Sequence, residues 1–165
     1  MLIKTKDLKD IQKNRVTLVK NFINLERNYD FNLISKFLEE NNSEVITKTN
    51  LGNLKNVYQM LNTTNYLPEF KIFFDFLFKI FKYKFDFKNQ LELYFSFTPQ
   101  VGVAHKDVED VFIIGLMGKT IYRIYDNKIT DYEIKKGDMI FIPCNVKHKA
   151  IGITPRIIAS IGFYT

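Results

Sequence analysis

The chain has two histidines, and each lies in a segment whose neighbours suit a metal ligand. His105 stands two residues before Asp107, in the segment from Gly102 to Phe112. In a β-strand, residues i and i+2 face the same side, so His105 and Asp107 can point at one spot. With His148 on a neighbouring strand, they would form the facial triad of two imidazoles and one carboxylate that holds Fe(II) and leaves coordination positions open. The sequence therefore predicts a metal site of His105, Asp107 and His148.

The composition is that of a globular protein with one domain. The chain has 165 residues, of which 46% are hydrophobic, so it can bury a sizeable core. Its net charge is +6, but the lysines are scattered and form no long block of like charges. This distribution favours a solvated lysine-rich surface over a nucleic-acid footprint.

Cysteine use and hydropathy indicate the compartment. The single cysteine, Cys144, excludes an internal disulfide and fits a reducing compartment. Its apolar surroundings favour a buried, inert thiol over a nucleophile. No apolar stretch of signal-peptide type follows the basic N-terminus, and the apolar region 70–81 is too short and too charged to span a bilayer. We therefore expect a cytoplasmic protein with no membrane partner.

The pattern divides the chain into a mainly helical half, residues 1–90, and a β-rich half, residues 91–165, within one α+β domain of residues 1–165. Residues 1–15 are polar and weakly patterned, and the patterning predicts no element there. A strand is expected at 16–19, a helix from Asp30 through Leu38, a strand at 45–49 and a short helix at 51–61. Asn41-Asn42-Ser43 should end the first of these helices.

Pro68 occupies a good first-turn position for a further helix that runs to about Lys84. Its apolar residues share one broad face: Phe70, Phe73, Phe74, Leu77, Ile80 and Phe81. Such a face should cover a sheet or pair with its copy in a homodimer.

From residue 91 the hydrophobic period becomes two, as in strands with one buried face. Strands are expected at 91–98, 101–107, 110–117, 119–126, 129–134, 138–143, 146–151 and 156–164, separated by glycines and other turn residues. About eight short strands with tight turns predict a jelly-roll or barrel. The β-rich half would then be the barrel core that carries the metal site.

The segment from Leu91 to Phe163 resembles the JmjC-type, or cupin-like, Fe(II)/2-oxoglutarate oxygenases. One feature is His105-Lys-Asp107, followed by an apolar strand, a glycine and the strand that ends in Tyr122-Arg-Ile-Tyr125. Another is Gly137-Asp138-Met-Ile-Phe-Ile-Pro143, with His148 at the expected distance after it. The last is the terminal strand Arg156–Phe163. The likeness is nearest to the protein hydroxylases, such as the asparaginyl hydroxylase of the hypoxia pathway and the ribosomal-protein histidine and arginine hydroxylases.

This resemblance implies a double-stranded β-helix, the cupin or jelly-roll fold, with N-terminal helices packed on the barrel. It also implies that Fe(II) is the cofactor and 2-oxoglutarate the cosubstrate. The family's reaction uses O₂, decarboxylates 2-oxoglutarate to succinate and hydroxylates a C–H bond. The substrate stays open between a protein side chain, a free amino acid and a nucleotide.

The distal carboxylate of 2-oxoglutarate needs a cation or several hydroxyls, because a buried charge must be paired. Protein hydroxylases usually place a lysine where this chain has Thr120, and Lys119 beside it would face the other way in a regular strand. Arg156 resembles the arginine that another branch of these oxygenases uses, and we expect it to be the main cation. Hydroxyls on the same face would come from Tyr94, Ser96, Thr120, Tyr122 and Ser160.

The sequence leaves two other functional interpretations open. The chain could be a metal-binding cupin that acts on a small molecule without 2-oxoglutarate, because the usual lysine is missing. It could also be a non-catalytic cupin-fold module for binding or dimerisation. Metal binding and 2-oxoglutarate binding separate the three readings.

Overall fold

The computed structural model describes residues 5–41, 45–47, 57–61, 63, 67, 70–81 and 91–164. Among these residues the helices are α1 (Thr5–Gln12), α2 (Phe31–Asn41) and α3 (Phe70–Phe81). The strands are β1 (Thr17–Val19), β2 (Val45–Thr47), β3 (Val57–Met60), β4 (Leu91–Ser96), β5 (Gln100–Val101), β6 (Asp110–Met117), β7 (Lys119–Tyr125), β8 (Ile129–Lys135), β9 (Met139–Ile142), β10 (His148–Gly152) and β11 (Arg156–Phe163).

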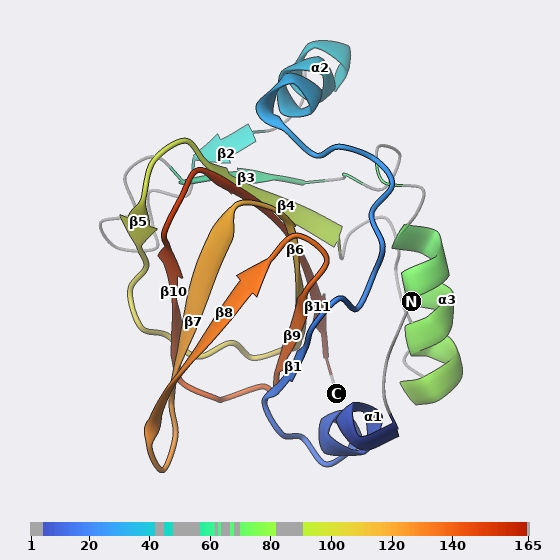
Figure 1. The fold of residues 1–165 in the computed structure, drawn as a ribbon, viewed down its shortest axis with the longest axis vertical. Coiled ribbons are helices and arrows are strands. Elements are labelled where there is room, and N and C mark those ends of the chain that lie inside the picture. The colour runs from blue at the N-terminus through green and yellow to red at the C-terminus, as the bar shows by residue number, and fades with distance from the viewer. Residues whose placement is uncertain are drawn as a thin grey trace.

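The strands form two antiparallel sheets that face each other. The larger sheet has the order β1-β9-β6-β11-β4-β3-β2, and the smaller has the order β5-β10-β7-β8. Every pairing between the described strands is antiparallel. In Figure 1 the smaller sheet stands opposite the larger one and the two enclose a barrel-like interior. This is the jelly-roll arrangement expected from the many short strands.

The two faces of the larger sheet bury different sets of side chains. On β11, Ala159 belongs to the apolar cluster on the outer face, whereas Ile158 belongs to the cluster between the sheets. This alternation follows from the period of two along a strand. The interior cluster also takes in Tyr122 of β7 and, at its edge, Tyr94 of β4. The interior therefore has tyrosines on both walls.

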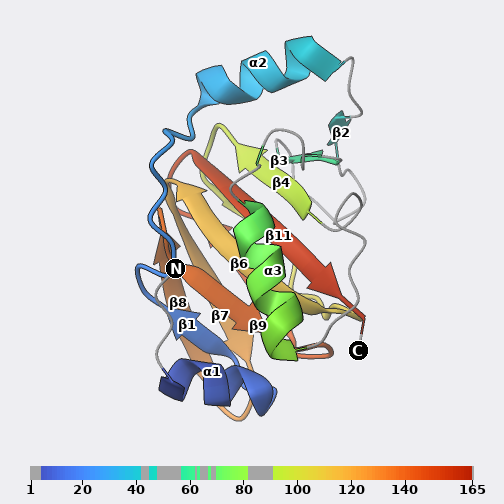
Figure 2. The same cartoon turned by 90° about the vertical axis from the view of Figure 1, so that its right-hand side faces the viewer.

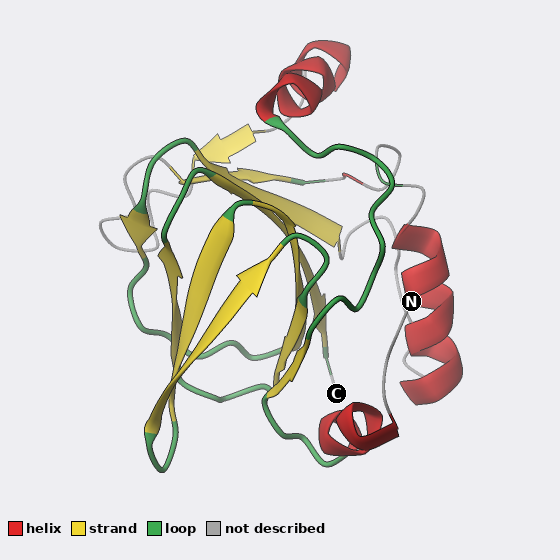
Figure 3. Ribbon diagram, viewed as in Figure 1, coloured by secondary structure: helices red, strands yellow, loops and turns green. Residues whose placement is uncertain are grey.

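Helix α3 covers the outer face of the larger sheet, as Figure 2 and the colouring by element in Figure 3 show. The ring of Phe73 lies 5.9 Å from that of Phe112 on β6. The residues of α3 that face the sheet are buried, namely Phe70, Phe73, Phe74 and Leu77, while Ile72 on the opposite side is 66% exposed. The side chains of Ile80 and Phe81 lie outside the described residues, as do Pro68 and residues 82–84. None of the described helices is long and apolar enough to cross a membrane.

Two expectations for the first half are wrong. Residues 57–60 form strand β3 instead of the end of a helix over 51–61, because they pair with β4 in regular antiparallel register. Residues 51–56 of that expected helix lie outside the described residues. Helix α1 occupies residues 5–12, where the polar pattern predicted no element. Its buried Ile11 joins the outer-face core, and this single contact is too weak a signal to detect in sequence.

The strand expected at 101–107 is also wrong over most of its length. Strand β5 ends at Val101, and the next pairing is an isolated bridge between His105 and His148. The reason is topological: β5 belongs to the smaller sheet and β6 to the larger one, so the chain must leave one sheet and enter the other between 105 and 110. Those residues cannot remain in a regular ladder.

A buried carboxylate joins the N-terminal segment to the barrel. Asp138 follows Gly137, whose φ of 84° is readily adopted only by glycine, and it has no exposed surface. Its carboxylate accepts hydrogen bonds from Lys20 Nζ at 2.8 Å, from the Asn21 amide at 3.0 Å and from the Lys135 amide at 3.1 Å. The same side chain thus closes the turn before β9 and holds the chain that follows β1.

Candidate metal centre

The two histidines meet through a backbone bridge between two segments. His105 donates its amide to the His148 carbonyl at 2.9 Å, and the His148 amide donates to the His105 carbonyl at 2.9 Å. This reciprocal pair places both side chains on the same side of the smaller sheet. The imidazole rings consequently lie with their centroids 4.5 Å apart.

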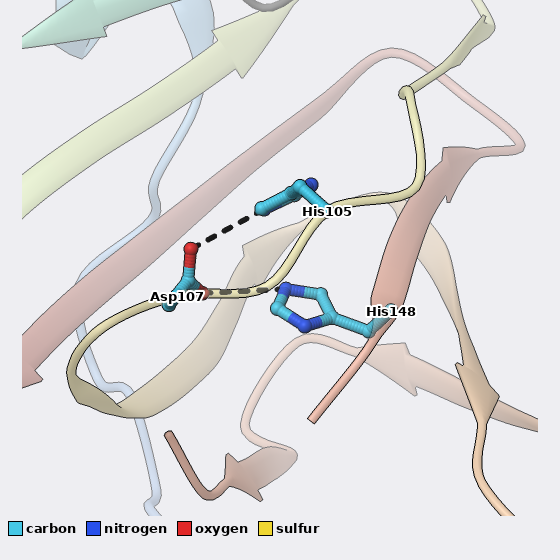
Figure 4. A group of neighbouring side chains, drawn as sticks. All are labelled: His105, Asp107 and His148. Carbon is cyan, nitrogen blue, oxygen red and sulfur yellow. Dashed lines mark ion pairs between the residues drawn. The ribbon is translucent and has the colours of Figure 1, made fainter. Parts of the chain in front are cut away.

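Asp107 completes the group from the loop that leaves the bridge. Its Oδ1 lies 3.4 Å from His105 Nε2, and its Oδ2 lies 3.4 Å from His148 Nε2. Figure 4 shows the carboxylate facing both rings, with one oxygen directed to each. One ligand atom from each residue falls within 4.8 Å of the others, so a single metal ion can reach all three. From the sequence, we expected strand alternation to place these residues together. In the structure, a backbone bridge and a loop do so instead.

The opposite nitrogen of each ring is held by a backbone carbonyl two residues earlier. His105 Nδ1 lies 2.9 Å from the Val103 carbonyl, and His148 Nδ1 lies 3.0 Å from the Val146 carbonyl. A carbonyl only accepts, so each Nδ1 carries a hydrogen, and the Nε2 atoms of both rings are the nitrogens that face Asp107. The Nε2 lone pairs and the Asp107 carboxylate oxygens are all hydrogen-bond acceptors. A cation placed between them can be bound by all of them. The donor set, with both rings fixed from behind, fits a divalent metal.

Burial favours the ligand form of His148. This ring is 3% exposed, and its burial lowers the pKa of the imidazole, with a smaller lowering from His105. The Val146 carbonyl and the Asp107 carboxylate act in the opposite direction. The neutral imidazole is the species that binds a metal, so this environment prepares His148 for coordination.

Two hydrogen bonds donated by backbone amides fix the loops that carry the ligands. The Asn145 amide donates to the Asp107 carbonyl at 2.8 Å, and the Cys144 amide donates to Asp110 Oδ1 at 2.7 Å. The turn between them contains Asn145 at a φ of 61°, a region that asparagine tolerates. Asp110 is buried, and its carboxylate ties the loop before His148 to the start of β6.

Arg156 is a buried cation in the barrel interior. It is 4% exposed, and its Nη1 has no hydrogen-bond partner among the described residues. The guanidinium lies against Gly152 of β10, where a Cβ would collide with it. Burial lowers the pKa of Arg156, and nearby Tyr122 partly offsets this. A buried guanidinium nitrogen with no partner among the described residues is suited to an anionic ligand.

Tyr122 connects Arg156 with the candidate metal centre. Its ring centroid lies 6.5 Å from that of His148, and it is close enough to Arg156 for the cation to lower the pKa of its hydroxyl. Burial raises that pKa by more, so the hydroxyl stays protonated at neutral pH. Tyr122 can therefore donate a hydrogen bond to a ligand that lies between Arg156 and the candidate metal centre.

The remaining cosubstrate candidates lie at several places. Thr120 is buried and Lys119 beside it is exposed, as expected from alternation along β7. Ser96 is buried, but its hydroxyl donates to the Thr98 carbonyl at 2.6 Å and is used within its own turn. Tyr94 faces the interior, and its hydroxyl donates to Glu92 Oε2 at 2.6 Å. Ser160 is half-buried opposite Glu92 in the register of β11 and β4.

Sequence reasoning missed Gln59 and Glu92, which lie on the same wall. Gln59 is 2% exposed, and its Oε1 has no hydrogen-bond partner among the described residues. It was hidden because the helical spacing around Tyr58 predicted a helix in place of β3. Glu92 alternates with the apolar Leu91 and Leu93, as any polar residue of such a strand does. No sequence motif marks either one.

The fold is similar to that of YcfD, a ribosomal oxygenase from Escherichia coli. One crystal structure of YcfD matches with a TM-score of 0.72 at 16% identity over 100% of this chain. Complexes of YcfD with cobalt and 2-oxoglutarate and with cobalt and succinic acid each match with a TM-score of 0.67, at 16% and 17% identity, over 98% of this chain. The matches cover 52% of YcfD, so this chain spans about half of its length.

No protein-family description matches the chain, and no curated protein is similar to it in sequence. At 16–17% identity the likeness to YcfD shows a shared fold. The chain thus shares the fold of the matched part of YcfD, with the candidate metal centre inside it.

Proposed function

We propose that this chain is an Fe(II)- and 2-oxoglutarate-dependent oxygenase that hydroxylates a protein side chain or a small molecule. The observation that carries the proposal is the convergence of two fixed imidazole Nε2 atoms and one carboxylate on a single point. Two imidazoles and one carboxylate leave half of an octahedral coordination sphere free, as non-haem Fe(II) oxygenases require. The YcfD complex with cobalt and 2-oxoglutarate supports this choice, since cobalt is a divalent metal of similar coordination chemistry.

His105, Asp107 and His148 would hold the metal, which supplies the oxidising chemistry when O₂ and 2-oxoglutarate are present. The carbonyls of Val103 and Val146 keep the two rings in the tautomer that coordinates. Of the three residues, His148 is buried, whereas His105 and Asp107 are partly exposed and would leave the metal accessible to ligands.

Arg156 would bind the distal carboxylate of 2-oxoglutarate. It is a buried cation whose Nη1 lacks a partner in the described part of the chain, and a guanidinium binds a carboxylate in a bidentate manner. Tyr122 lies between Arg156 and His148 and would donate to the same ligand. Lys119 is exposed and would have no part in this site.

The substrate is left at the level of class. YcfD is described as a ribosomal oxygenase, which is compatible with a protein substrate for a chain of this fold. This chain spans about half of the length of YcfD, so the remainder of YcfD has no counterpart within the matched length.

An anaerobic titration tests the proposal. Fe(II) and then 2-oxoglutarate are added to the protein, and the visible spectrum is followed. We expect the weak charge-transfer band of 2-oxoglutarate bound to Fe(II), and succinate on admission of O₂. Metal binding without the band would indicate a metal-dependent cupin of another activity. No metal binding would indicate a non-catalytic module.

A further inference from the structure

The smaller sheet has an outer face on which none of the described helices packs, and Figure 1 shows α1, α2 and α3 away from it. Tyr122 and Ile124 of β7 belong to the interior cluster, so the residues that alternate with them point outward. His148 of β10 faces the candidate metal centre, so Lys147 and Lys149 on either side of it point outward as well. The Tyr125 amide donates to the Lys147 carbonyl at 2.8 Å, which sets these two residues side by side.

Positive charge gathers on this outer face, although the lysines are scattered along the sequence. Asp131 and Glu133 of β8 also point outward, and both oxygens of Asp131 accept hydrogen bonds from Arg123, each at 2.7 Å. The charge of Asp131 is therefore largely used within one pair. Against these two carboxylates, the registers of β7, β8 and β10 bring five cations together: Lys119, Arg123, Lys135, Lys147 and Lys149. These five cations and Tyr125 are the basic face.

Two pairs of cations on the basic face lie directly opposite each other. Lys119 is opposite Lys135 between β7 and β8, and Arg123 is opposite Lys149 between β7 and β10. Like charges in such positions destabilise a sheet. In the described part of the chain, none of the four lysines of this face forms a side-chain ion pair. A bound anion would supply the missing opposite charge and relieve the repulsion.

The length of the basic face selects an anion with repeated charges. Lys119 and Tyr125 are the two ends of β7, about 20 Å apart at the rise of a strand. A single phosphate or carboxylate can contact one end of this row, whereas a polyanion can contact both. The partner therefore carries several negative charges along a chain.

Tyr125 distinguishes one kind of polyanion from the others. Its ring is partly exposed, and the Nζ atoms of Lys147 and Lys149 lie 5.8 Å and 5.9 Å from the ring centroid. A phosphate held by either ammonium would bring its own base close to this ring. Aromatic rings beside cations are the means by which proteins hold single strands without sequence preference. An acidic peptide offers carboxylates alone, and a duplex keeps the faces of its bases stacked inside.

We infer that the basic face binds single-stranded nucleic acid, with the lysines on its phosphates and Tyr125 on a base. This binding is separate from the proposed function, because the side chains involved point away from the candidate metal centre. A nucleic acid on the outer face would leave the metal ligands on the inner face free.

Fluorescence anisotropy with a labelled oligouridylate about 12 nucleotides long tests the inference, since single-strand binding folds cover a length of this order. We expect a dissociation constant on the order of micromolar at low salt, with affinity falling as salt is raised. The double variant Lys147→Ala, Lys149→Ala should bind about tenfold or more weakly. It should also lower the magnitude of the salt slope by about 1.4, because two phosphate contacts are lost at about 0.7 each.

Tyr125→Leu should weaken binding by about fivefold or more and leave the salt slope unchanged, because stacking releases no counterions. Tyr164→Leu removes an exposed tyrosine outside the basic face and is its matched control. The control for the lysine variant is Lys71→Ala, Lys79→Ala, which removes the same charge from the exposed side of α3. Both controls should bind the oligouridylate like the wild-type protein.

The melting temperature and the Mn(II) affinity separate recognition from general damage. Neither should fall in any of these variants, because the replaced side chains lie at the surface and none is a candidate metal ligand. A wild-type protein that binds the oligouridylate but no Mn(II) would contradict the oxygenase proposal and leave this inference standing.

Poly-L-glutamate, and vesicles of phosphatidylcholine with phosphatidylserine, serve as the other anionic probes. Binding of either one as tightly as the oligouridylate would overturn the inference and indicate a surface for an acidic protein or a membrane. The inference also fails if the wild-type protein does not bind the oligouridylate at low salt, if the lysine variant binds it normally, or if Tyr125→Leu behaves like Tyr164→Leu.

Discussion

The guanidinium of Arg156 lies against the Cα of Gly152, so closely that a Cβ at position 152 would occupy the place of Nη1. The two residues come from different sheets, since Arg156 begins β11 and Gly152 ends β10. The absence of a side chain at 152 therefore lets a cation from one sheet reach the inner surface of the other. This contact places the buried charge in the interior that also holds His148.

Gly152→Ala should displace Arg156 and weaken 2-oxoglutarate binding by about tenfold or more, because a charge-assisted bond depends strongly on geometry. His148 lies at the other end of β10, and His105 and Asp107 lie between β5 and β6, so Mn(II) affinity should be unchanged. Calorimetric titration of the variant with Mn(II) and then with 2-oxoglutarate measures both. An unchanged 2-oxoglutarate affinity would show that Arg156 is not part of the cosubstrate site.

Arg156→Ala should raise the 2-oxoglutarate requirement more than any substitution at Lys119. Loss of a buried charge-assisted pair costs on the order of 2–5 kcal/mol, or a factor of tens to thousands in affinity. Lys119→Ala removes an exposed charge on the same end of the barrel and is the matched control. Succinate formation as a function of 2-oxoglutarate concentration gives the comparison. The reverse ranking would move the cosubstrate site to Lys119.

His105→Ala, Asp107→Ala and His148→Ala should each abolish Fe(II) binding while leaving the fold intact. A facial site with one ligand missing loses its geometry as well as one bond. Lys149→Ala, on β10 beside His148, is the control and should bind metal normally. Circular dichroism checks the fold, and calorimetry with Mn(II) checks the site. Full 2-oxoglutarate turnover in His148→Ala would refute the assignment of the triad.

The candidate metal centre was predictable because the chain offers few alternatives. Two histidines and a carboxylate near one of them leave little choice of ligands, and this holds whether Asp107 lies on a strand or in a loop. Strand alternation likewise indicated that Thr120 and Lys119 would lie on opposite faces of β7. Both inferences depend on residue type and local period, which sequence displays directly.

The features that the sequence did not predict depend on contacts between segments that are distant along the chain. Strand β3 forms because β4 offers it an open edge, a tertiary effect that overrides the helical spacing around Tyr58. With β3 unforeseen, Gln59 could not be placed opposite Tyr94. The contact of Arg156 with Gly152 was equally hidden, because it joins two sheets whose packing no local pattern encodes.

Asp138→Ala should destabilise the protein by about 2–4 kcal/mol, since a buried carboxylate that serves one cation and two backbone amides is lost. Removing it leaves the Asn21 and Lys135 amides without that acceptor. Urea unfolding monitored by circular dichroism measures the change. Asp131→Ala breaks an exposed pair with Arg123 and should leave the unfolding midpoint nearly unchanged. Equal effects of the two variants would contradict the anchoring role of Asp138.

Phe74→Asp tests the packing of α3 on the larger sheet. Phe74 is 4% exposed, and its ring contacts Phe73, which packs on Phe112 of β6. Truncating a buried aromatic costs about 3–5 kcal/mol, and an unpaired carboxylate in its place adds to this. The variant should therefore unfold at a much lower urea concentration or precipitate. Ile72→Asp, on the exposed side of the same helix, should remain folded and monomeric or dimeric as the wild type is. If Phe74→Asp kept the wild-type melting temperature and mass, the helix would not contribute to the core, and its position over the sheet would be wrong.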